Sequence, residues 1–288
     1  MRIVGFKNSQ GLRLGVVEGD QVIDLQAVDA NLPADLGAIL RKTNGDLTSL
    51  SNLAKRAPAS ARIPLKGLTF ALPVANPGKI VLLGLNYMEH VKEGPQRDNI
   101  PKFPTYFMRG LTSLTPHEGP IVRPKVSDTL DYEAELVIVI GKRVRGLTKD
   151  NAYSAIAGWS CFNDGSVREW QRRTTQWDIG KNFDSTGGFG PWMVTRDDIA
   201  DGQVMTLVTR LNGQEMQRTT TDKLIHSIPR QIAHISAFTP LAPGDVIVTG
   251  TPGGVGAKRT PPVWMKPGDM VEVEVDAIGI LRNGIRAE

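Results

Sequence analysis

Short apolar runs separated by turn residues alternate along most of the chain, and this pattern predicts a mainly β protein with a few helices. The strands predicted near the N-terminus are residues 2–6, 12–17 and 21–25. Further strand-like runs cover residues 80–83, 136–140, 204–211, 246–249 and 270–275. Long alternation of strands with helices, which would indicate a doubly wound parallel sheet, is missing from the pattern.

Helical spacing of apolar residues is confined to a few segments. Residues 36–40 and 47–54 show this spacing, and Pro58 and Pro64 then interrupt it. The later segments that fit a helix are residues 150–157, 166–172 and 228–238. We therefore predict a small N-terminal α+β domain over residues 1–70 and a larger, mostly β domain over residues 71–288.

Composition excludes several classes of function. The formal net charge is +4, but Lys and Arg are dispersed along the chain without the basic cluster that follows a nucleic acid backbone. A single cysteine, Cys161, rules out an intrachain disulfide and fits a reducing compartment. The first residues lack an apolar signal core, and no apolar run approaches membrane-spanning length. We therefore expect a cytoplasmic protein that binds neither nucleic acid nor membrane.

Three carboxylates precede the strongest strand signal. Asp131, Glu133 and Glu135 alternate with apolar residues and lead into the apolar run 136–140, so a continuous strand would place them on one face. Carboxylates on one face repel each other unless solvent, a basic side chain or a hard divalent cation neutralises them. A strand end that projects into water has the same pattern, so other residues must decide between these interpretations.

Other polar residues are ambiguous when each is considered alone. Asp164 follows an apolar run and precedes a helical segment, which also fits a helix N-cap or a turn. Lys181 alone fits a solvated surface lysine. His90 and Glu93 would share one face of a helix, giving a base with an orienting carboxylate, although surface ion pairs have the same spacing.

The glycine-rich segment 249–256 lacks the spacing of either a P-loop or a dinucleotide-binding motif. A strand that leads into such a loop could present Thr251 and backbone N–H groups to a small carboxylate. A plain connection between two strands is the alternative. A Gly-x-Ser-x-Gly nucleophile elbow is also absent from the sequence.

Taken in order, these segments resemble the fumarylacetoacetate hydrolase family over roughly residues 78–285. The matching segments are 85–87 with His90 and Glu93; 130–136 continuing to 141–142; 163–164 with Ser166, Arg168 and Gln171; 181–184; 249–256; and 281–283. Each segment is a weak signal alone, whereas their common order is specific.

The resemblance implies a mixed β-roll or β-sandwich core, a homodimer, and Mg²⁺ or Mn²⁺ held by Glu133, Glu135 and Asp164. It also implies that Lys181 lies beside the metal and that His90 with Glu93 activates a water molecule. The positions that match substrate-facing residues of the family are Tyr87, Arg168, Gln171 and Thr251. Arg109 stands where the family often has a lysine, and its planar guanidinium suggests a carboxylate-bearing substrate.

The function that follows is a metal-dependent hydrolase that cleaves a carbon–carbon bond in acylpyruvates or related β-diketo acids, in aromatic or sugar-acid catabolism. A decarboxylase of oxaloacetate-like 2-oxo acids, or a keto–enol isomerase, would need the same metal and Lys181, because both reactions proceed through a stabilised enolate. A binding protein for a small dicarboxylate, without catalysis, is the alternative from another class.

Overall fold

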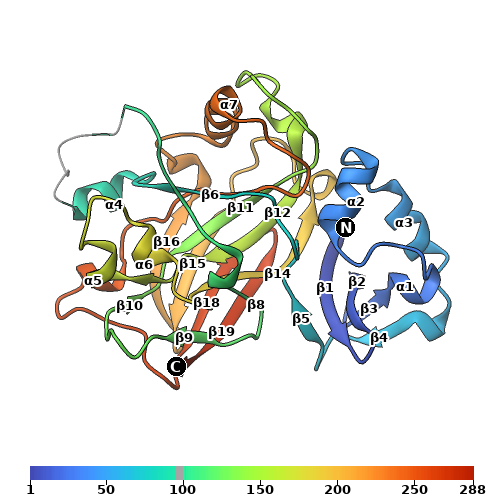
Figure 1. Ribbon diagram of the computed structural model, residues 1–288, viewed down its shortest axis with the longest axis horizontal. Coiled ribbons are helices and arrows are strands. Elements are labelled where there is room, and N and C mark those ends of the chain that lie inside the picture. Colours follow the sequence, from blue (N-terminus) through green and yellow to red (C-terminus); the bar gives the residue numbers. More distant parts are fainter. Residues whose placement is uncertain (95–99, 101) are drawn as a thin grey trace.

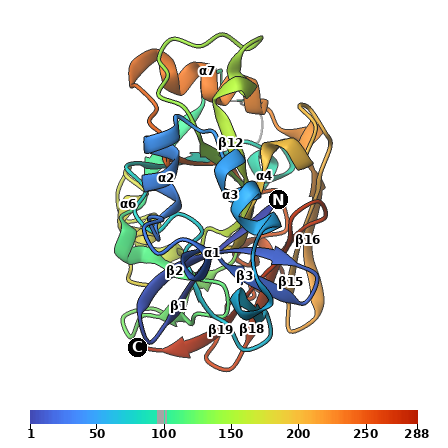
Figure 2. The ribbon, with the colours of Figure 1, turned by 90° about the vertical axis from the view of Figure 1, so that its right-hand side faces the viewer.

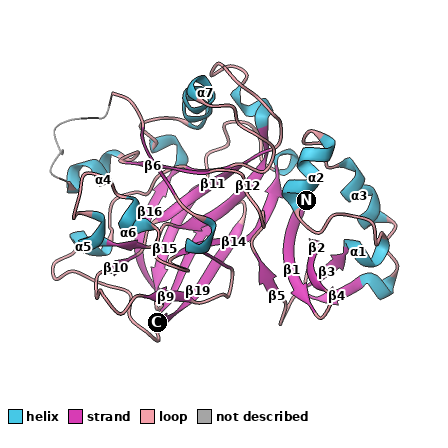
Figure 3. Ribbon diagram, viewed as in Figure 1, coloured by secondary structure: helices cyan, strands magenta, loops and turns pink. Residues whose placement is uncertain are grey.

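A computed structural model describes residues 1–94, 100 and 102–288. The strands of these residues form a 12-stranded mixed sheet, a five-stranded sheet and a two-stranded ribbon. Strands fill the middle of the molecule and helices lie around them (Figure 3). This architecture confirms the predicted mainly β class, with a small α+β region at the N-terminus.

The large sheet runs through the whole molecule. In spatial order its path is β4 (Arg62–Pro64), β3 (Gln21–Asp24), β2 (Gly11–Glu18), β1 (Arg2–Asn8), β14 (Gly187–Thr195), β12 (Ile156–Asn163), β11 (Ala134–Ile140), β17 (Val246–Val248), β6 (Ile80–Gly84) and β7 (Thr105–Met108). Beside this path, β5 (Thr69–Ala71) pairs with β1 and β8 (Leu114–Pro116) pairs with β14. Most neighbours are antiparallel, whereas β17 with β6 and β14 with β8 are parallel.

The second sheet packs against one face of the first. Its order is β16 (Gln214–Thr220), β15 (Thr206–Leu211), β18 (Met270–Val275), β19 (Gly279–Ala287) and β9 (Ile121–Arg123). The two-stranded ribbon joins β10 (Leu130–Asp131) to β13 (Ser166–Val167). A hairpin turn at Asn212–Gly213 connects β15 to β16, with both turn residues at positive φ.

Helices are short and pack around the sheets. The α-helices are α1 (Leu25–Val28), α2 (Leu36–Thr43), α3 (Thr48–Lys55), α4 (Met88–Glu93), α5 (Arg168–Gln171), α6 (Asp178–Lys181) and α7 (Ile228–Phe238). The 3₁₀ turns are Ala59–Ala61, Leu111–Ser113, Ala152–Ala155, Arg196–Asp198, Thr221–Lys223 and Gly256–Lys258. None of the helices in the described residues is both long and apolar enough to cross a lipid bilayer.

Strand β11 is covered on both faces, which explains its unbroken apolar sequence. Leu136 and Ile138 pack into the core between the two sheets, together with residues of β15, β18 and α7. Val137 and Val139 face the opposite core, which contains the apolar faces of α2 and α3. The strand is therefore packed on both sides, and this packing also restricts the movement of the residues at its start.

The strands of the N-terminal region are part of the large sheet. Figure 1 shows β1–β4 with α1–α3 at one end of the molecule, and in Figure 2 this end faces the viewer. Arg2 and Ile3 of β1 pair with Val194 and Met193 of β14, and β5 returns to pair with β1. The predicted boundary near residue 70 thus falls at β5, a strand that pairs with the N-terminal region.

Two predicted helices are wrong in whole or in part. Residues 152–155 form only a 3₁₀ turn, and Ile156 begins β12, which lies between β11 and β14 and is buried along its length. Residues 166–167 pair with β10, so α5 covers only Arg168–Gln171. In both segments, sheet pairing and burial override the helical spacing of the apolar residues.

His117 links the N-terminal region to the second sheet. Its ring packs edge-on against Phe70, with 4.5 Å between ring centroids, and its Nδ1 accepts a hydrogen bond from the Arg282 backbone N–H at 3.0 Å. Burial, assisted by the positive charge of Arg282, lowers the pKa of His117 from 6.5 to about 4. The neutral imidazole is therefore the form that the fold requires.

We expect acid to destabilise the protein partly through His117. As the pH falls from 6.5 to about 4, the unfolded chain takes up a proton that the folded chain does not, so the free energy of unfolding falls by up to about 3 kcal/mol. His117→Asn keeps an acceptor for Arg282 and removes the titration. Urea denaturation across this pH range should give a shallower decline for the variant. Parallel declines in the two proteins would contradict the prediction.

Candidate active site

Three carboxylates converge where β11 and β12 meet. Glu133 and Glu135 flank Ala134, the first residue of β11, and Ala134 pairs with Asn163 at the end of β12. Asp164 follows directly, and its backbone N–H donates to the Glu133 carbonyl at 2.8 Å. One oxygen from each of the three carboxylates lies within 4.8 Å of the others, and all three residues are buried.

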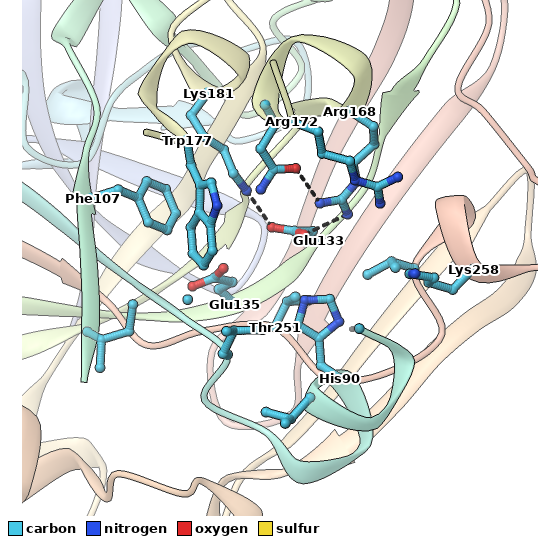
Figure 4. A pocket seen from close by; sticks show the side chains of 17 residues that line it. His90, Phe107, Glu133, Glu135, Arg168, Arg172, Trp177, Lys181, Thr251 and Lys258 are labelled. Carbon is cyan, nitrogen blue, oxygen red and sulfur yellow. Dashed lines mark hydrogen bonds and ion pairs between the residues drawn. The ribbon is translucent and has the colours of Figure 1, made fainter. Parts of the chain in front are cut away.

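Basic side chains alternate with these carboxylates in a buried chain of ion pairs. Lys181 Nζ lies 2.7 Å from Glu133 Oε2 and 2.5 Å from Asp164 Oδ2. Arg168 bridges Glu133 and Asp131, with N–O distances of 2.6 and 2.8 Å. Glu133 thus lies between Lys181 and Arg168, as Figure 4 shows. Removing one member would leave a buried charge without a partner, which costs about 3–5 kcal/mol in typical proteins.

Close helix packing brings Lys181 to this position. Gly180, the preceding residue of α6, lies against α5 so closely that an added Cβ would fall 2.4 Å from the backbone nitrogen of Gln171. A larger residue would push the two helices apart and withdraw the ammonium group. The surface position that Lys181 suggests when it is considered alone is wrong, because the side chain is only 1% exposed.

Neighbouring charges shift the pKa values of Glu133 and Glu135 in opposite directions. Burial raises the pKa of Glu133, but the charges of Arg168 and Lys181 outweigh burial and hold the pKa well below its usual range. Burial also raises the pKa of Glu135, and the negative charges of Asp164 and Glu133 raise it further. In the described part of the chain Glu135 has no ion-pair partner and accepts one hydrogen bond, from the Gly250 backbone N–H at 2.5 Å.

This donor set fits a divalent metal ion. Glu133, Glu135 and Asp164 present only oxygen atoms, which hard cations such as Mg²⁺ and Mn²⁺ prefer. The unbalanced charge at Glu135 is a second indication, since a buried carboxylate without a cation is costly. The three residues therefore form a buried acidic metal site.

His90 and Glu93 lie on α4 at the mouth of the same region. His90 Nδ1 and Glu93 Oε2 are 3.0 Å apart, as the i, i+3 spacing predicts. The other oxygen of Glu93, Oε1, accepts a hydrogen bond from the Gly254 backbone N–H at 2.6 Å. Glu93 therefore fixes the ring of His90 and also ties α4 to the glycine-rich loop.

The glycine-rich loop after β17 is fastened to the site at several points. Gly250, at φ +101°, turns its N–H toward Glu135, a conformation that L side chains rarely adopt. Thr251 accepts a hydrogen bond from Gln217 Nε2 at 3.0 Å and is buried. The loop is thus a shaped wall of the site and not merely a connection between strands.

These elements enclose a cavity of about 450 Å³, within the usual size range of small-molecule sites. The predicted site residues that line it are His90, Glu133, Glu135, Arg168, Gln171, Lys181 and Thr251. Figure 4 shows side chains from α4, α5, α6, β11 and the glycine-rich loop turned toward it. Apolar walls come from Leu83, Val91, Phe107, Trp177 and Val255.

Two predicted substrate-binding residues do not line this cavity. Arg109 is buried, with Nε 2.6 Å from Asp164 Oδ1 and its guanidinium donating to the Gly165 carbonyl at 2.5 Å. This guanidinium group holds Asp164 in place and has no free edge for a substrate carboxylate. Tyr87 is also buried and packs in the core between the sheets. Both side chains support the site from behind.

Asp131 departs from the expectation of one carboxylate-bearing strand face. The strand breaks at residues 132–133, between β10 and β11, and Asp131 turns away from the other carboxylates. It accepts hydrogen bonds from the backbone N–H groups of Gly256 and Ala257 at 2.7 and 2.9 Å, in addition to pairing with Arg168. Its role is to anchor the segment that follows the glycine-rich loop.

Other cavity residues are not among the predicted site residues. Arg172 follows the predicted Gln171 directly, and extending that segment by one residue would have included it. Lys258 lies in a 3₁₀ turn without a recognisable pattern, and only the fold brings it to the cavity.

A buried carboxylate cluster beside a cavity lined by a histidine that a glutamate orients is typical of metal-dependent enzymes. The sequence profile of the family "Fumarylacetoacetate (FAA) hydrolase C-terminal" matches residues 79–286. The protein therefore belongs to the fumarylacetoacetate hydrolase family and is an enzyme of that superfamily. This membership confirms the resemblance seen in the order of the sequence motifs.

Relatives in this family carry out different reactions. The human mitochondrial oxaloacetate tautomerase FAHD2A is 36% identical over 293 residues, covering 99% of this chain and 91% of the relative. Among solved structures, a fumarylacetoacetate hydrolase from Exiguobacterium antarcticum is 30% identical, with a TM-score of 0.85 and full coverage of both chains. A maleylpyruvate hydrolase from Sphingobium sp. SYK-6, in complex with a manganese(II) ion and pyruvate, is 29% identical, with a TM-score of 0.81 and coverage of 100% and 99%.

We expect Glu135→Gln to weaken Mn²⁺ binding at least about tenfold, because it removes a carboxylate ligand that pairs with no basic side chain of the described residues. Isothermal titration calorimetry of the purified protein measures this. The wild type should also bind Mn²⁺ more tightly as the pH rises, because the raised pKa of Glu135 means that the metal must displace a proton.

The matched control is Glu169→Gln, which removes an exposed glutamate of α5 at the edge of the site. Its Mn²⁺ affinity should stay within about twofold of the wild type. Equal losses in the two variants would mean that general surface charge, and not the carboxylate cluster, attracts the metal.

Proposed function

We propose that the protein is a divalent-metal-dependent keto–enol tautomerase of oxaloacetate-like 2-oxo dicarboxylic acids. The observation that carries the proposal is that His90, held by Glu93, lines the same cavity as Glu133 and Glu135. A base for proton transfer and a site for a metal-bound 2-oxo acid therefore face one enclosed space. Whole-length similarity to oxaloacetate tautomerases supports the same reaction.

The charge of the cavity supports a substrate with two carboxylates. Arg172 and Lys258 line it in addition to the buried Arg168 and Lys181. Arg168 and Lys181 are already paired with carboxylates, whereas in the described residues neither Arg172 nor Lys258 has an ion-pair partner. Burial and the nearby positive charge of Arg168 lower the pKa of Arg172, so an anion beside it would be stabilising. These two side chains suit the second carboxylate of a diacid.

A metal ion held by Glu133, Glu135 and Asp164 would supply Lewis acidity that favours the enolate of a 2-oxo acid. Lys181 adds a fixed positive charge where it lines the cavity, and this charge stabilises negative charge that develops on a substrate oxygen. Thr251 offers a hydroxyl group to the carboxylate next to the carbonyl. These residues hold the acid while a proton moves.

His90 is the group that moves the proton. Because an ionised Glu93 can only accept hydrogen bonds, Nδ1 of His90 carries the proton that they share and Nε2 is the basic nitrogen. Nε2 takes a proton from the carbon next to the substrate carbonyl, and the imidazolium then gives this proton to the enolate oxygen, which yields the enol. The same two transfers in reverse order regenerate the keto form. Glu93 balances the charge of the imidazolium that forms between these steps.

Hydrolysis of an acylpyruvate is the second candidate. The same His90–Glu93 pair can deprotonate a water molecule for attack on a distal carbonyl, and the relative solved with pyruvate is a maleylpyruvate hydrolase. This reaction needs space for an ordered water as well as the substrate. Tautomerisation moves one proton from carbon to oxygen without a second reactant and is therefore our first choice.

We expect His90→Gln to lower kcat for oxaloacetate tautomerisation by about 10²- to 10³-fold, because the variant lacks a general base. The assay follows the enol absorbance of oxaloacetate in the presence of Mg²⁺ or Mn²⁺, with a chelator control. Parallel assays with acylpyruvates test hydrolysis, and release of pyruvate from oxaloacetate tests decarboxylation.

The control variant is Glu89→Gln, an exposed residue of the same helix, and its kcat should remain within about twofold of the wild type. Retention of activity in His90→Gln would remove His90 from the mechanism. Turnover of acylpyruvates without turnover of oxaloacetate would move the assignment to the hydrolase.

Arg172→Gln and Lys258→Gln test the class of substrate. Each should raise the KM for oxaloacetate about fivefold, the effect of losing one partly exposed ion pair. The inhibition constant of pyruvate, which has only one carboxylate, should change less than twofold. Arg173→Gln is the matched control, because Arg173 stacks on Trp170, 3.6 Å from the ring centroid, and does not line the cavity. Equal effects on both ligands would exclude a distal carboxylate subsite.

A further inference from the structure

Gln217 of β16 lies behind the cavity, and its side-chain amide makes four hydrogen bonds. Oε1 accepts from the Ala134 backbone N–H at 3.0 Å and from the Thr209 hydroxyl at 2.7 Å. Nε2 donates to Thr251 Oγ1 and to the Pro252 carbonyl, both at 3.0 Å. The residue is 3% exposed and is not among those that line the cavity.

The two backbone partners fix the orientation of this amide. The Ala134 N–H can only donate, so the atom that it meets must be the amide oxygen. The Pro252 carbonyl can only accept, so the atom that it meets must be the amide nitrogen. A flipped amide would place Nε2 against the Ala134 N–H and Oε1 against the Pro252 carbonyl, and both mismatches would be buried.

This orientation determines the direction of the Thr251 hydroxyl group. Because Gln217 Nε2 donates to Thr251 Oγ1, the hydroxyl oxygen serves as acceptor in that bond and its own proton points elsewhere. Among the described residues no acceptor receives that proton. Thr251 lines the cavity, so a carboxylate bound there would meet a hydroxyl that is already oriented as a donor.

We infer that Gln217 is a positioning residue for substrate: it holds the Thr251 hydroxyl as a hydrogen-bond donor toward the carboxylate of the 2-oxo acid. The inference rests on the proposed function, because it takes that acid as the ligand. Gln217 does not touch the substrate and acts only through Thr251.

The Gln217 amide also connects the start of β11, beside the metal site, to the loop after β17. Ala134, whose N–H donates to Gln217, lies between the carboxylates Glu133 and Glu135. Thr251 and Pro252, at the other end of the amide, belong to the loop after β17. One rigid side chain therefore fixes the separation between the metal site and the carboxylate donor, and this separation must match the length of a bound 2-oxo acid.

A double-mutant cycle tests the inference. The variants are Gln217→Met, Thr251→Val and the double variant, and the probe is pyruvate, titrated by calorimetry into Mn²⁺-supplemented protein. Gln217→Met should raise the Kd of pyruvate about tenfold when Thr251 is present, the effect of losing one oriented hydrogen bond to a charged group. In the Thr251→Val background the same substitution should change the Kd less than twofold, because the hydroxyl that it orients is gone.

Gln217→Glu provides a second, independent variant of nearly the same size. A carboxylate has no N–H to donate, so the Thr251 hydroxyl would turn to donate to residue 217 and would present its oxygen lone pairs to the ligand. The Kd of pyruvate should therefore rise more than it does in Gln217→Met. A Kd equal to that of the wild type would overturn the inference. A cooperative thermal unfolding transition shows that the variant is folded.

The matched control is Thr219→Val, on the same face of β16, because Thr219 is buried and its hydroxyl has no partner in the described residues. Pyruvate binding should be unchanged in this variant. Equal losses from Gln217→Met in both backgrounds would assign Gln217 a purely structural role and overturn the inference. Failure of the wild type to bind pyruvate, with Mn²⁺ bound, would instead contradict the proposed function and remove the ligand on which the inference depends.

Discussion

A buried chain of alternating charges is the constraint on which the rest of the structure depends. Its members, in spatial order, are Asp131, Arg168, Glu133, Lys181, Asp164 and Arg109. Each charge is stable inside the protein only because its neighbours have the opposite sign, and loss of one would leave the next uncompensated. Glu135 stands beside the chain without a basic partner in the described residues, so its pKa is raised and a bound cation would take the place of its proton.

The fold supplies the rigidity that such a charge cluster needs. Strand β11 is covered on both faces by apolar cores, and its first residue separates two of the carboxylates. Strand β11 and the residues next to the ends of β11 and β12 carry the three carboxylates, whereas the short helices α5 and α6 carry Arg168 and Lys181. Opposite charges thus arrive on different elements, and the compact packing of those elements sets the distances between them.

Backbone hydrogen bonds connect the His90–Glu93 pair to the carboxylate cluster. The loop after β17 donates to Glu135 through Gly250 and to Glu93 through Gly254, so the metal site and the His90 pair share one segment of chain. Gln217 holds the same loop to β11. A substrate between these groups would meet partners whose orientations are set before it binds, which is the main source of catalytic power in sites of this type.

The sequence alone determined the mainly β class, the strand that leads from Glu133 into the core, and the pairing of His90 with Glu93, because each depends on residues close together in the chain. It also placed Asp164 and Lys181 in the site, although only through the order of the family motifs. Tertiary structure alone decided that Arg109 lies behind the cavity and not in it, and that β12 replaces a predicted helix. Such features depend on contacts between distant segments and on burial, which local spacing does not encode.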